Sequence, residues 1–246
     1  MRNTKNHSCA GFTLVELSIV IVIIGLIVAG VVGGQTLVKQ AKLRTIAADF
    51  QKFETALNAF LLSYDQLPGD FDKAQDYWGA GVNNGNDDNF ITCEGGAQRH
   101  EAIDVWEHLY RAEILSEIYV GASGAGNQDV SVGGVNVPKS SYSNQVYSIF
   151  SSNPFIIFNR QIMMSIVFGT QGTSCPWCNG GLLANDARSI DMKVDDGIAN
   201  QGKLLGVDGN APAAGSCSQK YTTAGADYNL SSTLEACRLF YIYRGN

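Results

Sequence analysis

Histidine and basic residues are scarce in this sequence. Its 246 residues include three histidines, and the 17 lysines and arginines are outnumbered by 23 aspartates and glutamates, which gives a formal net charge of −6. No basic cluster occurs after the first few residues. A protein that binds duplex DNA through its phosphates needs many lysines or arginines on one surface, so no nucleic-acid-binding patch is evident.

Common catalytic strings are also missing. The sequence contains neither Gly-x-Ser-x-Gly nor His-Glu-x-x-His. His7 lies close to the N-terminus, and His100 and His108 lie on an expected helix without an evident nucleophile beside them. We therefore expect solvent-exposed histidines on that helix and a protein that is not an enzyme.

One long apolar run stands near the N-terminus. Residues 12–32 form a stretch that, as a helix, would span about 31 Å, close to the ~30 Å hydrocarbon core of a bilayer. Glu16 is the only ionisable side chain in this stretch. A carboxylate within lipid costs on the order of a few kcal/mol unless it finds a partner, so this acid is by default a functional group.

The polar segment before the run distinguishes it from an ordinary secretory signal. Residues 1–11 carry Arg2 and Lys5 and should stay in the cytoplasm while the rest is exported. An ordinary signal has a shorter apolar core of about 7–15 residues, with small residues at a cleavage site after it. Here the small pair Ala10-Gly11 precedes the run, so cleavage would leave the apolar helix on the mature chain.

The string Gly11 to Leu17 (GFTLVEL) and the run behind it resemble the class III prepilin signal of type IV pilins and type II secretion pseudopilins. The resemblance implies that a prepilin peptidase cuts after Gly11 and methylates the new N-terminal residue, Phe12. It also implies that Glu16 pairs with the N-terminal amine of a neighbouring subunit and sets the register of assembly. The alternative is a plain signal anchor in which Glu16 lies near the membrane interface.

A second helical pattern follows the apolar run. Apolar residues recur at spacings of three and four, which places them on one helical face: Leu43, Ile46, Phe50, Phe53, Leu57, Phe60 and Tyr64. We expect this face to pack on the chain's own head domain, as the resemblance also implies; a free coiled coil is the alternative. Gly30, Gly33 and Gly34 lie between the two patterns, and each costs about 1 kcal/mol relative to Ala, so the helix should bend or melt there.

The expected fold is α+β and pilin-like, with a long N-terminal helix packed on a small antiparallel-sheet head. Its parts are a cleaved leader (1–11), a transmembrane and assembly helix (12–34), an amphipathic helix (35–66) and a globular head (67–246). In the head, the patterns predict helices at 98–115 and 185–194, strands at 146–150, 155–158, 162–168, 203–207 and 239–243, and a long mobile surface loop over 121–144.

Two polar strings could hold a metal. Asn84, Asn86 and Asp88 alternate as the first oxygen ligands of an EF-hand-like calcium loop do, but Gly95 occupies the twelfth place, so Glu94 or Glu101 would have to fold back. A polar turn is the alternative.

The second string carries Asp191, Asp195 and Asp196 at a helix C-terminus. Lys193, Lys203 or a metal should relieve their charge there, and we expect a structural role for this string.

Six cysteines require a redox interpretation. Cys9 lies in the leader, and the other five would face an oxidising compartment, where disulfides persist: Cys93, Cys175, Cys178, Cys217 and Cys237. Five cannot all pair, so at least one is left over. The resemblance implies a Cys217–Cys237 bridge like the C-terminal disulfide loop of type IV pilins. A local Cys175–Cys178 bridge would then leave Cys93 odd, and pairing of Cys93 with either of them stays open.

The C-x-x-C string from Cys175 to Cys178 also invites a thioredoxin-like interpretation. Asn179-Gly180-Gly181 follows at once and disfavours a helix that starts at the motif, so redox activity is the weaker hypothesis. A four-cysteine zinc site is weaker still, because Cys217 and Cys237 are too far apart in sequence to form a second close pair.

The resemblance implies a structural subunit, of the minor kind given its length, in a type IV pilus or a type II secretion pseudopilus. Its partners would be other pilin or pseudopilin subunits, the prepilin peptidase and an inner-membrane assembly platform. Before assembly it would be a single-pass protein of a bacterial inner membrane, with its N-terminus cytoplasmic and its head periplasmic. We expect no cofactor other than possible calcium. The alternative is a signal-anchored periplasmic binding or thiol-redox domain that does not polymerise.

Overall fold

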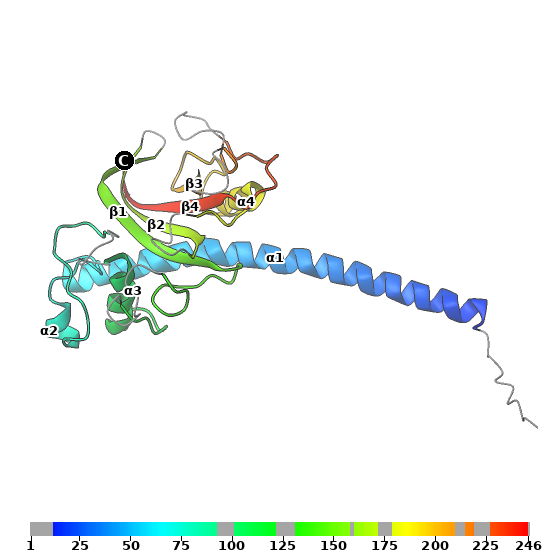
Figure 1. The fold of residues 1–246 in the computed structure, drawn as a ribbon, viewed down its shortest axis with the longest axis horizontal. Coiled ribbons are helices and arrows are strands. Elements are labelled where there is room, and N and C mark those ends of the chain that lie inside the picture. The colour runs from blue at the N-terminus through cyan, green and yellow to red at the C-terminus, as the bar shows by residue number, and fades with distance from the viewer. Residues whose placement is uncertain are drawn as a thin grey trace, which may run out of the picture. The chain divides into compact units, whose positions relative to one another are not determined.

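The computed structural model describes residues 12–92, 101–121, 131–157, 160–171, 179–209, 215–218 and 227–245. It divides the chain into two compact units, Met1–Ala41 and Lys42–Asn246. Helix α1 (Leu14–Tyr64, 51 residues) belongs to both units (Figure 1). Its residues up to Ala41 lie in the first unit, and the rest of the helix is the first element of the second. The helix ends just before Leu67-Pro68-Gly69-Asp70, and Gly69 has a positive φ of 87° that suits a glycine.

Helix α1 runs without interruption through Gly30, Gly33 and Gly34. A Cβ atom built on any of the three would meet nothing within 4 Å. The predicted break is therefore absent from the single chain, and melting at these glycines on assembly stays a prediction.

The second unit contains a four-stranded antiparallel sheet in the order β1-β2-β4-β3 (Figure 1). Its strands are β1 (Gln145–Ile157), β2 (Arg160–Thr170), β3 (Leu204–Asp208) and β4 (Cys237–Gly245). The strands predicted at 146–150 and 155–158 are one strand, because β1 continues through a register shift between Ser151 and Phe155. The strands predicted at 162–168 and 239–243 are found, each two residues longer at both ends, and the strand predicted at 203–207 is found one residue later.

The apolar face of α1 packs on this sheet and forms the centre of the core. Leu43, Ile46, Phe50, Phe53, Leu57 and Phe60 are at most 3% exposed. The Phe50 ring stacks on Tyr241 of β4 at 5.1 Å and meets Tyr147 of β1 edge-on at 5.8 Å. Burying each such aromatic side chain contributes about 1.5–3 kcal/mol, so the stripe stabilises this arrangement strongly. The prediction of an amphipathic helix on its own head is confirmed.

Three shorter helices complete the described part of the second unit. They are α2 (Ala74–Trp78), α3 (Glu101–Arg111) and α4 (Ala184–Val194). Helix α3 buries Ala102, Val105, Trp106 and Leu109, as predicted, but it ends at Arg111 rather than at 115. Helix α4 begins one residue before the predicted start and ends where predicted.

The expectation of a mobile surface loop is wrong for residues 131–144. Asn136 and Val137 are fully buried there, and Ser140 is 5% exposed. Isolated bridges join Gly133 to Val137 and Lys139 to Val146 of β1. Residues 122–130 of the predicted loop lie outside the described residues. The segment forms a packed turn in which Gly133 approaches β1 closely, since a Cβ atom at Gly133 would meet the Val146 side chain at 2.9 Å.

Candidate functional site

The start of α1 is closed by a capping box between Thr13 and Glu16. The Thr13 main-chain N–H and its hydroxyl both donate to Oε2 of Glu16, each at 2.8 Å, and Oγ1 of Thr13 accepts from the Glu16 N–H at 3.3 Å. These bonds satisfy main-chain donors that a helix start leaves without partners. The acid in the apolar run therefore has a local partner within its own chain.

Beyond this cap, α1 exposes an uninterrupted apolar surface. Every residue from 12 to 38 is exposed, and Phe12 and Leu14 exceed 80%. By length and composition, α1 is the helix of the described chain that could cross a membrane. An apolar surface of this extent in water is costly, so it needs lipid or other helices as its surroundings.

A family model described as the prokaryotic N-terminal methylation motif matches residues 6–32, which contain the capping box and most of this apolar surface. The chain carries the prokaryotic N-terminal methylation motif. This motif is the signal of type IV pilins and pseudopilins, as predicted. No curated protein and no solved structure matches the chain.

The methylation motif contains three of the predicted assembly positions. Phe12 and Glu16 lie in its described part, whereas Gly11 lies outside the described residues. Cleavage after Gly11, methylation of Phe12 and pairing of Glu16 with a neighbouring amine stay predictions. Among the hinge glycines, Gly30 lies within the matched residues and Gly33 and Gly34 lie just beyond them.

Polar contacts that sequence patterns did not indicate fix the second half of α1 on the sheet. The carboxylate of Glu54 accepts from the Tyr241 hydroxyl at 2.5 Å and pairs with Nζ of Lys203 at 2.6 Å. One turn further along, Asn58 accepts from the Tyr243 hydroxyl at 2.8 Å. Since these partners lie more than 140 positions away in the sequence, no local pattern could have revealed them.

The predicted disulfide between Cys217 and Cys237 is present. Cys237 begins β4, and both half-cystines are fully buried. The Cys217 N–H donates to Oδ1 of Asp208 at 2.5 Å, so the bridge joins residues 215–218 to the ends of β3 and β4. Cys9, Cys93, Cys175 and Cys178 lie outside the described residues, and their pairing stays a prediction.

The acidic string at the end of α4 is held by hydrogen bonds. Carboxylate oxygens of Asp191, Asp195 and Asp196 all lie within 4.8 Å of one another. Burial and a hydrogen bond to Asp195 raise the pKa of Asp191 to about 9, so this pair holds a proton at neutral pH. The Tyr228 hydroxyl donates to Asp191 at 2.7 Å.

The expected charge relief by a lysine side chain at this string is wrong. Lys193 donates to the Ser189 carbonyl at 2.5 Å, and Lys203 is paired with Glu54. Lys203 contributes its main-chain N–H, which, together with that of Leu204, donates to Oδ2 of Asp195. The string therefore connects the end of α4 to the start of β3, which agrees with the structural role expected for it.

The segment predicted as a calcium loop is a turn organised around Asp70. The main-chain N–H groups of Asp88 and Asn89 donate to the Asp70 carboxylate at 3.1 and 2.8 Å. Oδ1 of Asn84 accepts from the Gln75 N–H at 2.8 Å, and Nδ2 of Asn86 donates to Asp88 at 2.6 Å. The three predicted ligand side chains thus have protein partners, and calcium binding stays a prediction.

The expectation of a solvent-exposed His108 is wrong. Its ring is fully buried and lies 5.5 Å from the Trp78 ring. Nδ1 accepts from the Gly69 N–H at 2.9 Å, and Nε2 lies 2.9 Å from the Asn83 carbonyl, to which it donates. Burial lowers the pKa of His108 to about 4, so the ring is neutral and fastens residues 69–83 to α3. His100 lies outside the described residues.

Proposed function

We propose that this protein is a minor structural subunit of a type IV pilus or type II secretion pseudopilus. The observation that carries the proposal is the methylation motif at residues 6–32, directly continuous with an exposed apolar helix. Cleavage after Gly11 retains that helix and creates a new amine at Phe12. The chain then needs a peptidase to process it, a membrane platform to assemble it and other subunits to bury its helix.

Assembly in this proposal is mechanical rather than catalytic. The apolar residues of α1 leave lipid and pack on the helices of other subunits. Glu16 pairs with the Phe12 amine of a neighbour, because both charged groups are costly in an apolar environment when unpaired. The head, fixed on the second half of α1 by its aromatic core, coats the filament. Before assembly the protein spans the inner membrane with its head in the periplasm.

Replacing Glu16 tests this mechanism, and Thr13 offers a matched control. Glu16→Ala removes both the capping carboxylate and the acid proposed for pairing, whereas Thr13→Val removes the capping hydroxyl and keeps the acid. Loss of a helix cap alone costs about 1 kcal/mol. We expect Glu16→Ala to abolish sedimentable filaments while membrane insertion is retained, and Thr13→Val to assemble at close to the normal level.

Equal assembly defects in the two variants would mean that Glu16 acts through the cap. Normal assembly of Glu16→Ala would contradict the proposed pairing. Absence of filaments from the unmodified chain, together with stable membrane insertion, would favour a signal-anchored periplasmic domain that does not polymerise.

A further inference from the structure

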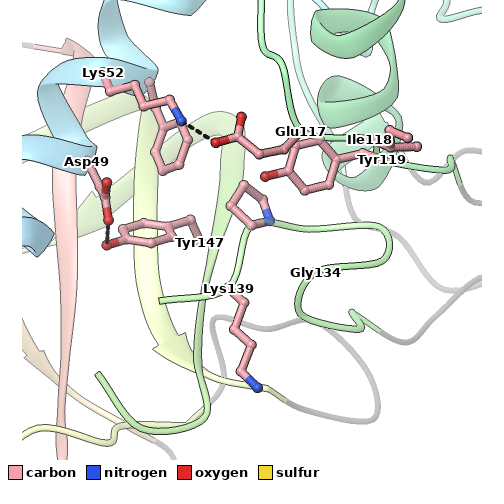
Figure 2. Close-up of a pocket in the computed structure, with 10 residues that line it drawn as sticks. Asp49, Lys52, Glu117, Ile118, Tyr119, Gly134, Lys139 and Tyr147 are labelled. Carbon is pink, nitrogen blue, oxygen red and sulfur yellow. Dashed lines mark hydrogen bonds and ion pairs between the residues drawn. The ribbon is translucent and has the colours of Figure 1, made fainter. Parts of the chain in front are cut away.

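Lys42 and Arg44 of α1 are exposed basic side chains at the start of the second unit. Neither forms an ion pair with an acidic side chain in the part of the chain that the structure describes. Lys52, further along the same helix, differs from them because its amine is paired with Glu117 at 2.8 Å (Figure 2). The charges of Lys42 and Arg44 are therefore open to a partner outside the chain.

The sequence around these two side chains is free of negative charge. No aspartate or glutamate occurs between Glu16 and Asp49, whereas the whole chain has a formal net charge of −6. Positive charge is thus concentrated at one level of α1 in a chain that is acidic overall. A charge asymmetry of this kind fits an anionic partner at that level.

The placement of Lys42 and Arg44 around the helix shows what shape this partner has. Two residues of α-helix correspond to about 3 Å along the axis and roughly 200° around it. Leu43, between them, is fully buried against the head. Lys42 and Arg44 thus lie on the two flanks of α1 at nearly the same height. A folded protein would contact one flank, whereas a layer of lipid headgroups surrounds a helix that crosses it and reaches both.

The height of the two side chains along α1 also fits the headgroup layer. The continuous apolar run ends at Val32 and the exposed apolar surface at Val38, so Lys42 lies about 6–15 Å beyond the hydrocarbon core. Headgroups extend about 5–8 Å beyond that core on each side. Each Cα–Cβ bond of a helix tilts toward its N-terminus, here the membrane end, and long basic side chains extend further in that direction.

We propose that Lys42 and Arg44 bind the phosphate groups of anionic phospholipids in the leaflet that faces the head. The Arg44 guanidinium can form two parallel hydrogen bonds to one phosphate, and the Lys42 amine binds a second on the other flank. These contacts hold an acidic head close to an anionic surface that would otherwise repel it. The inference rests on the membrane-spanning state in the proposed function and does not depend on polymerisation.

Native mass spectrometry of the full-length protein, released from bilayers of phosphatidylcholine and phosphatidylglycerol in equal parts, tests the contact. Phosphatidylglycerol should predominate among the lipids that stay bound. A basic residue near an anionic surface increases binding about fivefold, so Lys42→Gln combined with Arg44→Gln should lower the ratio of phosphatidylglycerol to phosphatidylcholine by about tenfold or more. High salt should lower the ratio for the unmodified protein too, because it screens exposed charges.

Lys73→Gln is the matched control. Lys73 is exposed and precedes α2, whose Tyr77 ring lies 5.5 Å from that of Tyr64 at the end of α1. Tyr64 is about 33 Å beyond Lys42 along the helix, which exceeds the range of a screened charge. Lys73→Gln should therefore leave the lipid ratio unchanged. Equal ratios for the unmodified protein and the double variant, or an equal loss in Lys73→Gln, would overturn the inference.

A photo-crosslinking residue at Thr45, which is exposed beside Arg44, identifies the partner directly. We expect adducts with the mass of one phospholipid in membranes that contain the unassembled protein. Adducts with proteins alone would overturn the inference and leave the proposed function standing. Lipid adducts on a chain that forms no filaments would support the inference and contradict the proposed function. Extraction of the chain from membranes by alkaline carbonate would contradict both.

Discussion

The hydroxyl of Tyr241 donates a 2.5 Å hydrogen bond to the carboxylate of Glu54, across 187 positions of sequence. The same carboxylate pairs with Lys203, so one side chain of α1 holds the central strand β4 and the edge strand β3. In the proposed function, a subunit drawn from the membrane by its N-terminal helix has to transmit force from that helix to its head. Glu54 lies at this connection.

We predict that Glu54→Ala lowers the free energy of unfolding by about 1.5–3 kcal/mol, because it removes the charged acceptor of the Tyr241 hydroxyl and the ion pair with Lys203. Glu54→Gln keeps an acceptor for Tyr241 and loses mainly the ion pair with Lys203, which is 43% exposed. An exposed pair contributes at most about 1 kcal/mol, so this variant should cost less. Denaturant unfolding in detergent measures both, and equal losses would contradict the role given to Tyr241.

His108 should make the protein less stable in acid. The folded pKa of about 4 lies below the ordinary value of 6.5, so the unfolded chain binds the extra proton between these pH values. The contribution of His108 to the free energy of unfolding should therefore fall as the pH drops from about 6.5 to about 4, by on the order of 3 kcal/mol. His108→Gln should remove this slope. A variant that kept the full slope would contradict the assignment.

Ionisation of Glu101 should have the opposite effect on the pH dependence of stability, over an overlapping pH range. Burial raises the pKa of Glu101 from 4.5 to about 7, against hydrogen bonds from Thr92 that lower it. The folded chain then binds the extra proton, so stability should decrease as the pH rises from about 4.5 to about 7. Glu101→Gln should abolish this decrease and leave the rise due to His108. Glu113→Gln, at an exposed position just after α3, is the control and should not change the profile.

Reduction of the Cys217–Cys237 bridge should destabilise the head. The bridge closes a loop of 20 residues, for which chain entropy predicts a contribution of about 3 kcal/mol. Cys217→Ser should reproduce the effect of reductant on the unfolding midpoint, and Cys9→Ser, in the predicted leader, should have none. A midpoint of Cys217→Ser equal to that of the unmodified protein would contradict this prediction.

Local patterns predicted the elements whose environment is set by their own sequence. The spacing of Phe50, Phe53 and Phe60 revealed the buried face of α1, since a regular apolar period requires one packing surface. The string from Gly11 to Leu17 indicated the methylation motif. Polar residues interrupt the apolar pattern of β1, so the sequence suggested two strands where a register shift allows one.

Contacts between distant segments could not be read in this way. In the sequence, His108 has the pattern of an exposed helix residue. In the folded chain, Gly69 and Asn83 form hydrogen bonds with its two ring nitrogens. In the sequence, the turn containing Asn86 and Asp88 resembles a cation-binding loop. In the folded chain, the Asp70 carboxylate accepts hydrogen bonds from the main chain of this turn. In both cases a polar group is satisfied by a partner from another segment, and side-chain type alone does not specify that partner.

The intact mass of the protein extracted from its native membrane tests the central claim most directly. Gly11→Val provides an uncleaved reference, and Gly25→Val, within the apolar run, is its matched control. We predict that the unmodified chain and Gly25→Val begin at Phe12 and carry one added methyl group, while Gly11→Val keeps residues 1–11. An unmodified chain that still begins at Met1 would contradict processing by a prepilin peptidase, and with it the account of this protein as a pilus or pseudopilus subunit.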